Sequence, residues 1–269
     1  MRKLLLAVAL TAALASIAEA QKVHDARVAD LVQAGTVRLA LFLPQYTKNS
    51  VTGEVLGNGP GVVAVEVGRA LAARLGVKLL LAGYPTPDAV VDCLKVGACD
   101  TALIAITPSR TAELGFTPPV VQQDYTYLVP AGSSIKSAAD ADQPGVRIAV
   151  VRNHLSTLAL SRVLKRADLV YAEAPDLTFD LLRTGHADVM ASARPTLLNY
   201  LPKLPGSRVL EDRYGANIQA MAVPKSQAGW LAYFSEFLEE AKASGMVQRA
   251  IENAGLRDAY RVVPSAKPN

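Results

Sequence analysis

Short apolar runs alternate along this chain with longer stretches whose apolar residues recur every three or four positions. The short runs lie between polar or glycine-containing segments, which is typical of buried strands, and the longer ones have helical spacing. We predict strands at 37–42, 77–81, 125–129, 147–151, 169–172 and 216–223. We predict helices at 62–75, 88–96, 177–184, 196–201, 227–243 and 246–254. Strands that alternate with helices predict an α/β fold with mostly parallel sheets.

One helix-turn-strand unit occurs twice. Residues 94–105 match residues 182–193 without a gap, and Leu, a basic residue, Gly and Asp recur at the same offsets. Gly97 and Gly185 end the helices, and the apolar run after each is a buried strand. Two equivalent units predict two lobes with a cleft between them, at the carboxyl ends of the strands.

Two strands are expected to carry the chain from one lobe to the other and back. These are 125–129 and 216–223, so the first lobe is discontinuous in sequence. We assign residues 21–128 and 218–269 to lobe 1 and residues 129–217 to lobe 2. The two crossings predict a two-strand hinge and a two-lobed binding-protein fold.

The N-terminus has the pattern of a signal peptide. Arg2 and Lys3 precede the apolar run 4–14, and a small-x-small sequence ends at Ala20. We expect cleavage there, so that the mature chain starts at Gln21 and is exported to the periplasm. No later apolar run reaches the roughly 20 residues needed to span a bilayer, which predicts no stable membrane insertion.

Composition narrows the function classes. The chain has 269 residues, 51% of them hydrophobic, which is ample for a core. Its net charge of +4 is mild and evenly scattered, so nucleic acid is not an expected partner. Nucleophile-elbow, phosphate-loop and zinc-protease motifs are absent, and the histidines are dispersed. We expect a monomer without cofactor or metal.

Cys93 and Cys99 are the only cysteines. In an oxidising compartment we expect a disulfide between them, from the end of a helix to the start of a strand. Metal binding is the rival interpretation, but the CxxC spacing is missing.

Arg110 is the leading candidate for ligand contact. It ends the loop 107–110, which follows the first-copy strand, and Ala105 and Thr107 flank it at the strand end. A guanidinium offers planar, bidentate donors that match a carboxylate. The alternative is a surface arginine at a helix start, but a cation there opposes the helix dipole.

The chain resembles the periplasmic solute-binding proteins of family 3, which serve ABC importers of polar amino acids and related small molecules. The matching segments are 60–76, 94–100, 106–110, 116–119, 132–135, 147–151 and the second repeat. The resemblance covers essentially the whole mature chain. It implies that Arg110 pairs with a ligand carboxylate and that the partners are a small anionic or zwitterionic solute and an inner-membrane ABC permease.

Two departures bear on the ligand. In amino-acid binders the second-lobe strand ends at an aspartate that receives the α-ammonium group, and here that position is Ala193, followed by Arg194. Family members also usually carry Gly-Thr-Thr or a similar run at 153–155. The wall of the binding cleft that this run forms in the family is therefore altered in this chain. These departures favour a carboxylate whose ammonium group, if present, is not strongly recognised.

Other candidates have two interpretations each. Arg194 either adds a positive ligand contact or pairs with an acidic residue across the closed cleft. Arg152 and His154, with Leu155 beside them, follow a buried strand and either face an anionic group or lie in solvent. We expect Asp100 and Asp188, which recur together at strand starts, to fasten a turn, or a helix to a strand, rather than to act as catalytic acids.

The loop 43–60 is expected to form one wall of the cleft. Within it, Tyr46 and Gln45 either stack on and hydrogen-bond the ligand or pack within the loop. Asn217 and Gln219 lie on the return strand, where their amides can bind ligand or hinge backbone.

Three functions remain open. The first is a binding protein that closes on a small carboxylate and presents the closed form to a permease. The second is an accessory or sensing subunit on the same fold. The third is an enzyme similar to periplasmic cyclohexadienyl dehydratases, for which Glu66, Glu113 and Glu173 are the available general acids.

Overall fold

A computed structural model describes residues 25–265. The predicted cleavage after Ala20 lies outside the described residues. Within the described part of the chain, no helix is both long enough and apolar enough to cross a membrane.

The structure contains strands and helices in alternation along most of the chain. The strands are β1 (Thr36–Phe42), β2 (Tyr46–Lys48), β3 (Val55–Gly57), β4 (Lys78–Tyr84), β5 (Thr101–Ala105), β6 (Leu114–Phe116), β7 (Val121–Val129), β8 (Arg147–Val151), β9 (Asp168–Ala172), β10 (Val189–Ala193), β11 (Arg208–Val209), β12 (Gly215–Pro224) and β13 (Arg261–Val262). The helices are α1 (Ala29–Ala34), α2 (Pro60–Leu75), α3 (Pro87–Lys95), α4 (Pro108–Glu113), α5 (Ala138–Ala141), α6 (Leu155–Ser161), α7 (Pro175–Arg183), α8 (Arg194–Leu198), α9 (Ala228–Ala243) and α10 (Met246–Asn253), with short 3-10 turns at Ala26–Val28 and Leu201–Lys203.

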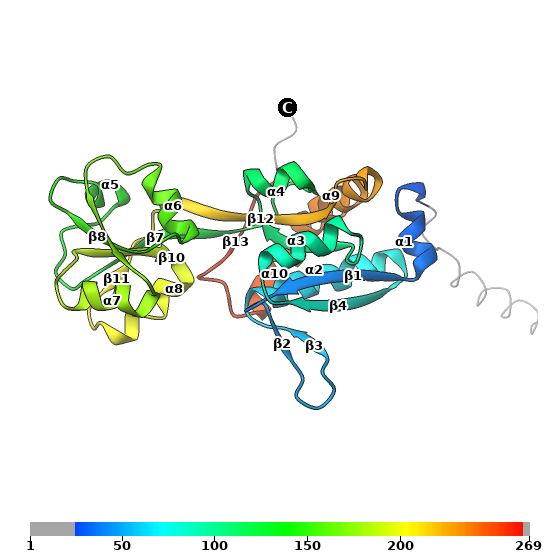
Figure 1. Cartoon of the computed structure of the whole chain (residues 1–269), viewed down its shortest axis with the longest axis horizontal. Helices are drawn as coiled ribbons and strands as arrows, with labels where there is room; N and C mark the ends of the chain where they lie inside the picture. The colour runs from blue at the N-terminus through cyan, green and yellow to red at the C-terminus, as the bar shows by residue number, and fades with distance from the viewer. Residues whose placement is uncertain (1–24, 266–269) are drawn as a thin grey trace, which may run out of the picture.

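One continuous sheet joins two groups of helices and strands, in the order β4-β1-β5-β12-β7-β10-β8-β9. The outer strands on both sides run parallel, and β7 and β12 pair antiparallel with each other. Figure 1 shows β7 and β12 passing between the two groups, with β1 and β4 on one side and β8 and β10 on the other. The predicted α/β fold class, with two lobes and two crossing strands, is confirmed.

The internal repeat has the same local structure in both copies. The Arg38 backbone N–H donates to Asp100 (2.7 Å), and its guanidinium forms an ion pair with that carboxylate. The Arg147 backbone N–H donates to Asp188 (2.8 Å), and its guanidinium also forms an ion pair. In each copy the aspartate precedes one strand (β5 or β10) and the arginine lies on its parallel neighbour (β1 or β8). These aspartates therefore fasten adjacent strands at the ends away from the cleft.

Each lobe has its own buried core. The largest cluster joins α2, α9 and α10 to the sheet of lobe 1 and includes Leu39, Leu71 and Phe234. Lobe 2 has one cluster around Tyr127 and a second in which the rings of Phe179 and Tyr200 stack. Separate cores let the lobes keep their internal structure when the strands between them bend.

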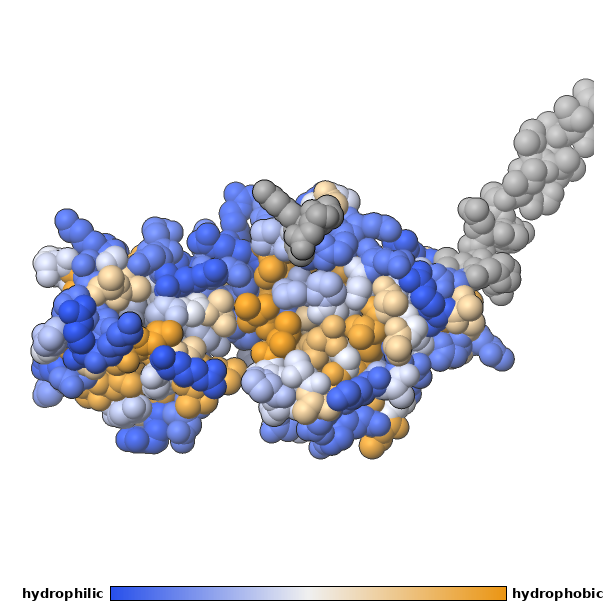
Figure 2. Space-filling model, turned by 90° about the horizontal axis from the view of Figure 1, so that it is seen from above, coloured by the Kyte–Doolittle hydropathy of each residue, from blue (hydrophilic) through white to orange (hydrophobic). Residues whose placement is uncertain are grey.

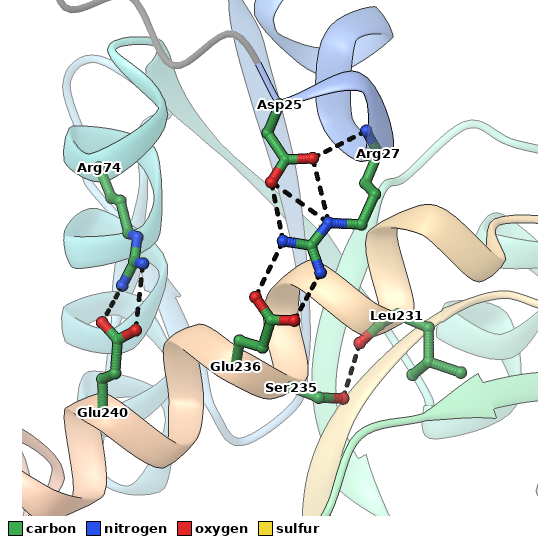
Figure 3. A network of polar contacts seen from close by, with 7 residues as sticks. All are labelled: Asp25, Arg27, Arg74, Leu231, Ser235, Glu236 and Glu240. Atoms are coloured by element: carbon green, nitrogen blue, oxygen red, sulfur yellow. Dashed lines mark hydrogen bonds and ion pairs between the residues drawn. The ribbon is translucent and has the colours of Figure 1, made fainter.

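The start of the described chain is fastened to lobe 1 by ion pairs. Arg27 bridges Asp25 and Glu236, with Nη1 2.6 Å from Glu236 Oε1. One turn further along α9, Glu240 binds Arg74 of α2 (Figure 3). These pairs join the N-terminal segment, α2 and α9 on the surface of lobe 1.

Asp124 lies where the chain crosses between lobes, and its side chain is buried. Its carboxylate is 2.8 Å from Arg213 Nη1, 3.4 Å from Arg261 Nε and 4.0 Å from Arg194 Nε. Arg213 precedes β12, Arg261 lies on β13 and Arg194 begins α8. One carboxylate therefore connects three segments beside the crossing strand β7.

The structure differs from the sequence-based expectations mainly in loops. The region 43–60 contains the hairpin of β2 and β3, which projects from lobe 1 (Figure 1). Helix α6 begins at Leu155 because the His154 side chain accepts the Ser156 N–H as an N-cap. Helix α8 begins at Arg194, with Pro195 in its first turn. The expected loops before these two helices are therefore shorter.

Candidate functional site

A cleft of about 680 Å³ lies where the two lobes meet above the crossing strands. Its wall in lobe 1 comes from α3, the end of β5 and α4, and its wall in lobe 2 comes from α6. Figure 2 views the molecule from above and shows apolar residues on both halves and beside their junction. The lining residues are Asp88, Val91, Asp92, Ala105, Ile106, Thr107, Pro108, Ser109, Arg110, Glu113, Tyr125, Leu155, Leu158, Ala159, Arg162, Ala216, Asn217 and Ile218.

A short helix holds Arg110 at the cleft. The Thr107 side chain caps α4 by accepting the Arg110 N–H, and Pro108 occupies the first turn. The predicted loop 107–110 is therefore a helix start, although it delivers the arginine to the cleft as expected. Thr107 and Ser109 add hydroxyl groups to the same wall, 3.0 Å from each other.

Arg110 is half-buried and forms no ion pair with the residues that the structure describes. Its Nη1 donates to the Ala105 carbonyl (3.1 Å), which leaves other donors of its guanidinium available. Burial lowers the pKa of Arg110, and the attraction of Asp88 opposes that shift. A partly desolvated guanidinium without a carboxylate partner is suited to binding an anion.

The wall of lobe 2 is largely apolar. Leu155 and Leu158 lie on α6 and are 47% and 46% exposed. Ala159 and, at the end of the helix, Arg162 complete this wall. The first two turns of α6 therefore present hydrocarbon to the cleft.

His154 precedes this wall and acts as the cap of α6. Its Nδ1 lies 2.8 Å from Ser156 Oγ. Nearby protein atoms displace part of the water around the ring and lower the pKa of His154, although its side chain stays exposed. His154 is not among the residues that line the cleft.

The crossing strands form the floor of the cleft. Tyr125 of β7 and Asn217 and Ile218 of β12 line it. Burial raises the pKa of Tyr125 to about 12, so its hydroxyl keeps its proton at neutral pH. Asn217 reaches the cleft as the sequence suggested, whereas Gln219 is buried and lies outside the lining set.

The lobe 1 wall carries three acidic residues, of which Glu113 was considered from the sequence and Asp88 and Asp92 were not. Asp88 and Asp92 lie one turn apart on α3, and Glu113 ends α4, where it forms an ion pair with Lys95. The signal for Asp88 and Asp92 was present in the helical spacing of 88–96. That spacing could not show which face of α3 meets the cleft.

Tyr46 and Gln45 pack within lobe 1 and do not line the cleft. The Tyr46 ring lies against the backbone of Gly83, where an added Cβ would be 2.6 Å from ring atoms. Gln45 is 4% exposed, and its Oε1 accepts the Phe42 N–H at 3.4 Å. Of the two interpretations of this loop, the structure favours internal packing.

Arg152 and Arg194 also lie outside the lining set. Arg152 pairs with Glu173 and lies over the Tyr171 ring, 4.8 Å from its centre. Arg194 is 5% exposed, and its Nη2 donates to the carbonyls of Leu210 and Glu211 at 2.9 and 2.8 Å. Its Nη2 is thus bound to the backbone before β12, and its Nε lies 4.0 Å from the Asp124 carboxylate.

Two further expectations concern cysteines and metals. Cys93 and Cys99 are joined by a disulfide, which confirms the predicted pairing. Among residues 25–265, no group of three or more His, Cys, Asp or Glu side chains is arranged to hold a metal ion.

Comparison with known proteins relates the chain to one family and one fold. Residues 58–254 match the bacterial extracellular solute-binding proteins, family 3. No curated protein matches the chain in sequence. Among solved structures, an ancestral cationic amino acid solute binding protein is similar, with a TM-score of 0.63 and 24% identity over 84% of this chain and 98% of that one.

Two other solved structures have the same fold. A putative binding component of an ABC transporter from Wolinella succinogenes, complexed with lysine, has a TM-score of 0.60 and 23% identity over 81% of this chain and 95% of that one. An ancestral cyclohexadienyl dehydratase has a TM-score of 0.57 and 24% identity over 84% of this chain and 95% of that one. Binding proteins and an enzyme therefore share this architecture, and the residues of the cleft must decide between them.

Proposed function

The chain belongs to the bacterial extracellular solute-binding proteins of family 3, and on that basis we propose that it captures a small carboxylate-bearing solute in its interlobe cleft and delivers it to an ABC importer. The observation that carries this proposal is Arg110, a half-buried cation in the cleft without an ion-pair partner among the described residues. A ligand carboxylate supplies the missing partner, and a bidentate pair with guanidinium fixes its orientation.

The proposed ligand contacts come from both walls. Arg110, Thr107 and Ala105 hold the carboxylate end from lobe 1, and Leu155 covers the ligand from lobe 2. Ala193, which ends β10, is buried and has no group to accept an ammonium. This residue supports a ligand whose α-ammonium group, if it has one, is not held at the end of β10; the carboxylates of Asp88 and Asp92 line the opposite wall of the cleft.

Closure of the cleft is the proposed signal to the importer. We assign residues 21–128 with 218–269 to one moving lobe and residues 129–217 to the other. A ligand that contacts both walls stabilises the closed state, because only a difference in affinity between the two states shifts their populations. We place this activity in the periplasm, after removal of the signal peptide, and we propose that the protein works as a monomer.

The three glutamates considered as general acids from the sequence support binding rather than dehydration. Catalysis needs a general acid positioned beside the ligand. Glu66 and Glu173 lie outside the cleft, where they pair with Arg69 and Arg152, and Glu113 pairs with Lys95. The glutamates available from the sequence are therefore held in ion pairs.

The first prediction is that Arg110→Gln strongly reduces ligand-dependent stabilisation. Mature protein is unfolded and refolded to remove bound ligand, and its thermal stability is measured with amino acids, 2-oxo acids, dicarboxylates and aromatic acids. A ligand at 100 times its Kd adds about 2.7 kcal/mol to the wild type. Loss of charged hydrogen bonds worth about 1.5 to 3 kcal/mol weakens binding by about tenfold or more.

Arg69→Gln is the matched control, because Arg69 is an exposed arginine of α2 outside the cleft. It should bind like the wild type. Carboxylate binding that survives Arg110→Gln contradicts the proposed clamp. If leucine binds at least about tenfold more tightly than 4-methyl-2-oxopentanoate, an ammonium acceptor exists, and the expectation from Ala193 that an ammonium group is not strongly recognised is wrong. If no solute binds, an accessory or sensing role is favoured.

A further inference from the structure

Large apolar side chains line the cleft and remain open to it. Leu155 and Leu158 of α6 are 47% and 46% exposed, and Ile218 of β12 is 38% exposed. All three line the cleft that contains Arg110. Exposed hydrocarbon on a concave surface is favourably covered by an apolar ligand group, because covering removes it from water.

The two walls differ in chemistry. The wall of lobe 1 carries the hydroxyls of Thr107 and Ser109 and the charges of α3 and α4. The wall of lobe 2 is apolar along the first two turns of α6, and its charged group, Arg162, follows one turn beyond Leu158. A ligand that spans the cleft therefore meets a charged surface at one end and hydrocarbon at the other.

We propose that the ligand is an amphipathic monocarboxylate, with its carboxylate on Arg110 and an aliphatic or aromatic body packed against Leu155, Leu158 and Ile218. This inference rests on the proposed function and adds the substrate class. Because Leu155 and Leu158 belong to lobe 2 and Arg110 to lobe 1, such a ligand contacts both lobes at once. The apolar body then supplies the differential affinity that favours closure.

Leu155 and Leu158 lie on a different face of α6 from Leu160, which packs in the core of lobe 2. Leu160, two residues after Leu158, is fully buried in the core of lobe 2. Leu155 and Leu158 are three residues apart, which places them on one face of the helix. That face points into the cleft, so these leucines contribute little to the core of lobe 2.

The test measures how affinity depends on the length of the apolar chain. Refolded mature protein is titrated by calorimetry with 2-oxo monocarboxylates from 2-oxopropanoate to 2-oxohexanoate. Each buried methylene contributes about 0.8 kcal/mol, so affinity should rise about fourfold per methylene. In Leu158→Asn the increase in affinity should fall below about twofold per methylene.

Two further variants keep the test specific. Leu177→Asn on α7 changes an exposed leucine (53%) that does not line the cleft, and it should keep the wild-type dependence on chain length. Leu158→Met should keep most of the wild-type dependence on chain length, because methionine is apolar and of similar volume. Thermal unfolding of each variant checks that the fold is kept.

The outcomes distinguish this inference from the proposed function. Binding that requires Arg110 but does not depend on chain length overturns the apolar subsite and leaves the carboxylate clamp intact. Tighter binding of 2-oxopentanedioate than of 2-oxopentanoate also overturns it, because a second carboxylate would then be recognised, with Arg162 as the nearest candidate on that wall. No binding of any carboxylate overturns both proposals.

Discussion

Two arginines of this protein follow equivalent strands but have different surroundings. Arg110 comes after β5, and Arg194 comes after β10. Arg110 keeps donors open to the cleft, whereas Arg194 is buried against two backbone carbonyls and lies near Asp124. Residue type alone could not separate these roles, because it does not show which groups surround each guanidinium.

Substitution of Arg110 should therefore weaken ligand binding, whereas substitution of Arg194 should mainly lower the stability of the fold. Arg194→Gln removes buried hydrogen bonds of a charged group and should destabilise the fold by about 1.5 to 3 kcal/mol. Its ligand affinity should stay within about threefold of the wild type, because Arg194 does not line the cleft. Urea unfolding and calorimetric titration measure both quantities. A large loss of affinity at unchanged stability would return Arg194 to the binding site.

At the scale of elements, the repeat lets one copy serve as a control for the other. Cys99 N–H donates to the Cys93 carbonyl (3.3 Å) in the first copy, and Ala187 N–H donates to the Leu181 carbonyl (3.0 Å) in the second. The same turn therefore forms with a disulfide in lobe 1 and without one in lobe 2. The turn geometry comes from Gly97 and Gly185, which both have positive φ, and the disulfide adds stability to it.

The double variant Cys93→Ala/Cys99→Ala should fold and bind ligand with unchanged affinity. Closing so short a loop contributes about 2 kcal/mol in the chain-entropy model, so the free energy of unfolding should fall by about that amount. Urea unfolding of the variant, with the wild type measured oxidised and reduced, tests this. Failure of the variant to fold would mean that the turn of lobe 1 depends on its disulfide, unlike the turn of lobe 2.

At the scale of the whole molecule, ion pairs are distributed over the surfaces of both lobes. Arg147 lowers the pKa of Asp188 in lobe 2, and Arg27 and Arg74 lower those of Glu236 and Glu240 in lobe 1. Because these folded-state pKa values lie below the unfolded ones, the pairs stabilise the fold above the unfolded pKa values. That stabilisation is lost as pH falls through the folded values.

We therefore expect the free energy of unfolding to fall modestly between pH 7 and pH 5, because the lowered pKa of His154 keeps that ring neutral in the fold, and to fall further below about pH 4.5, where carboxylates begin to be protonated. The variant Asp188→Asn/Glu236→Gln/Glu240→Gln should be less stable at neutral pH and should lose less stability on acidification. Urea unfolding at a series of pH values measures both curves. Parallel curves would show that other groups control the acid transition.

Most of the fold could be predicted from the chain itself. The apolar periodicity located most of the main strands and helices, and the repeat indicated two equivalent lobes, because both signals depend on residues close in sequence. The contact of Cys93 with Cys99 and the place of Arg110 at a strand end were local in the same sense.

Only the tertiary structure decided which side chains face the cleft. Tyr46 could pack inward because Gly83, on another strand, leaves room for its ring. Asp92 and Leu158 reach the cleft because α3 and α6 present those faces to it. The sequence determines which elements form and which chemical groups they carry. Which of those groups share a site depends on how distant elements pack, and local pattern does not contain that information.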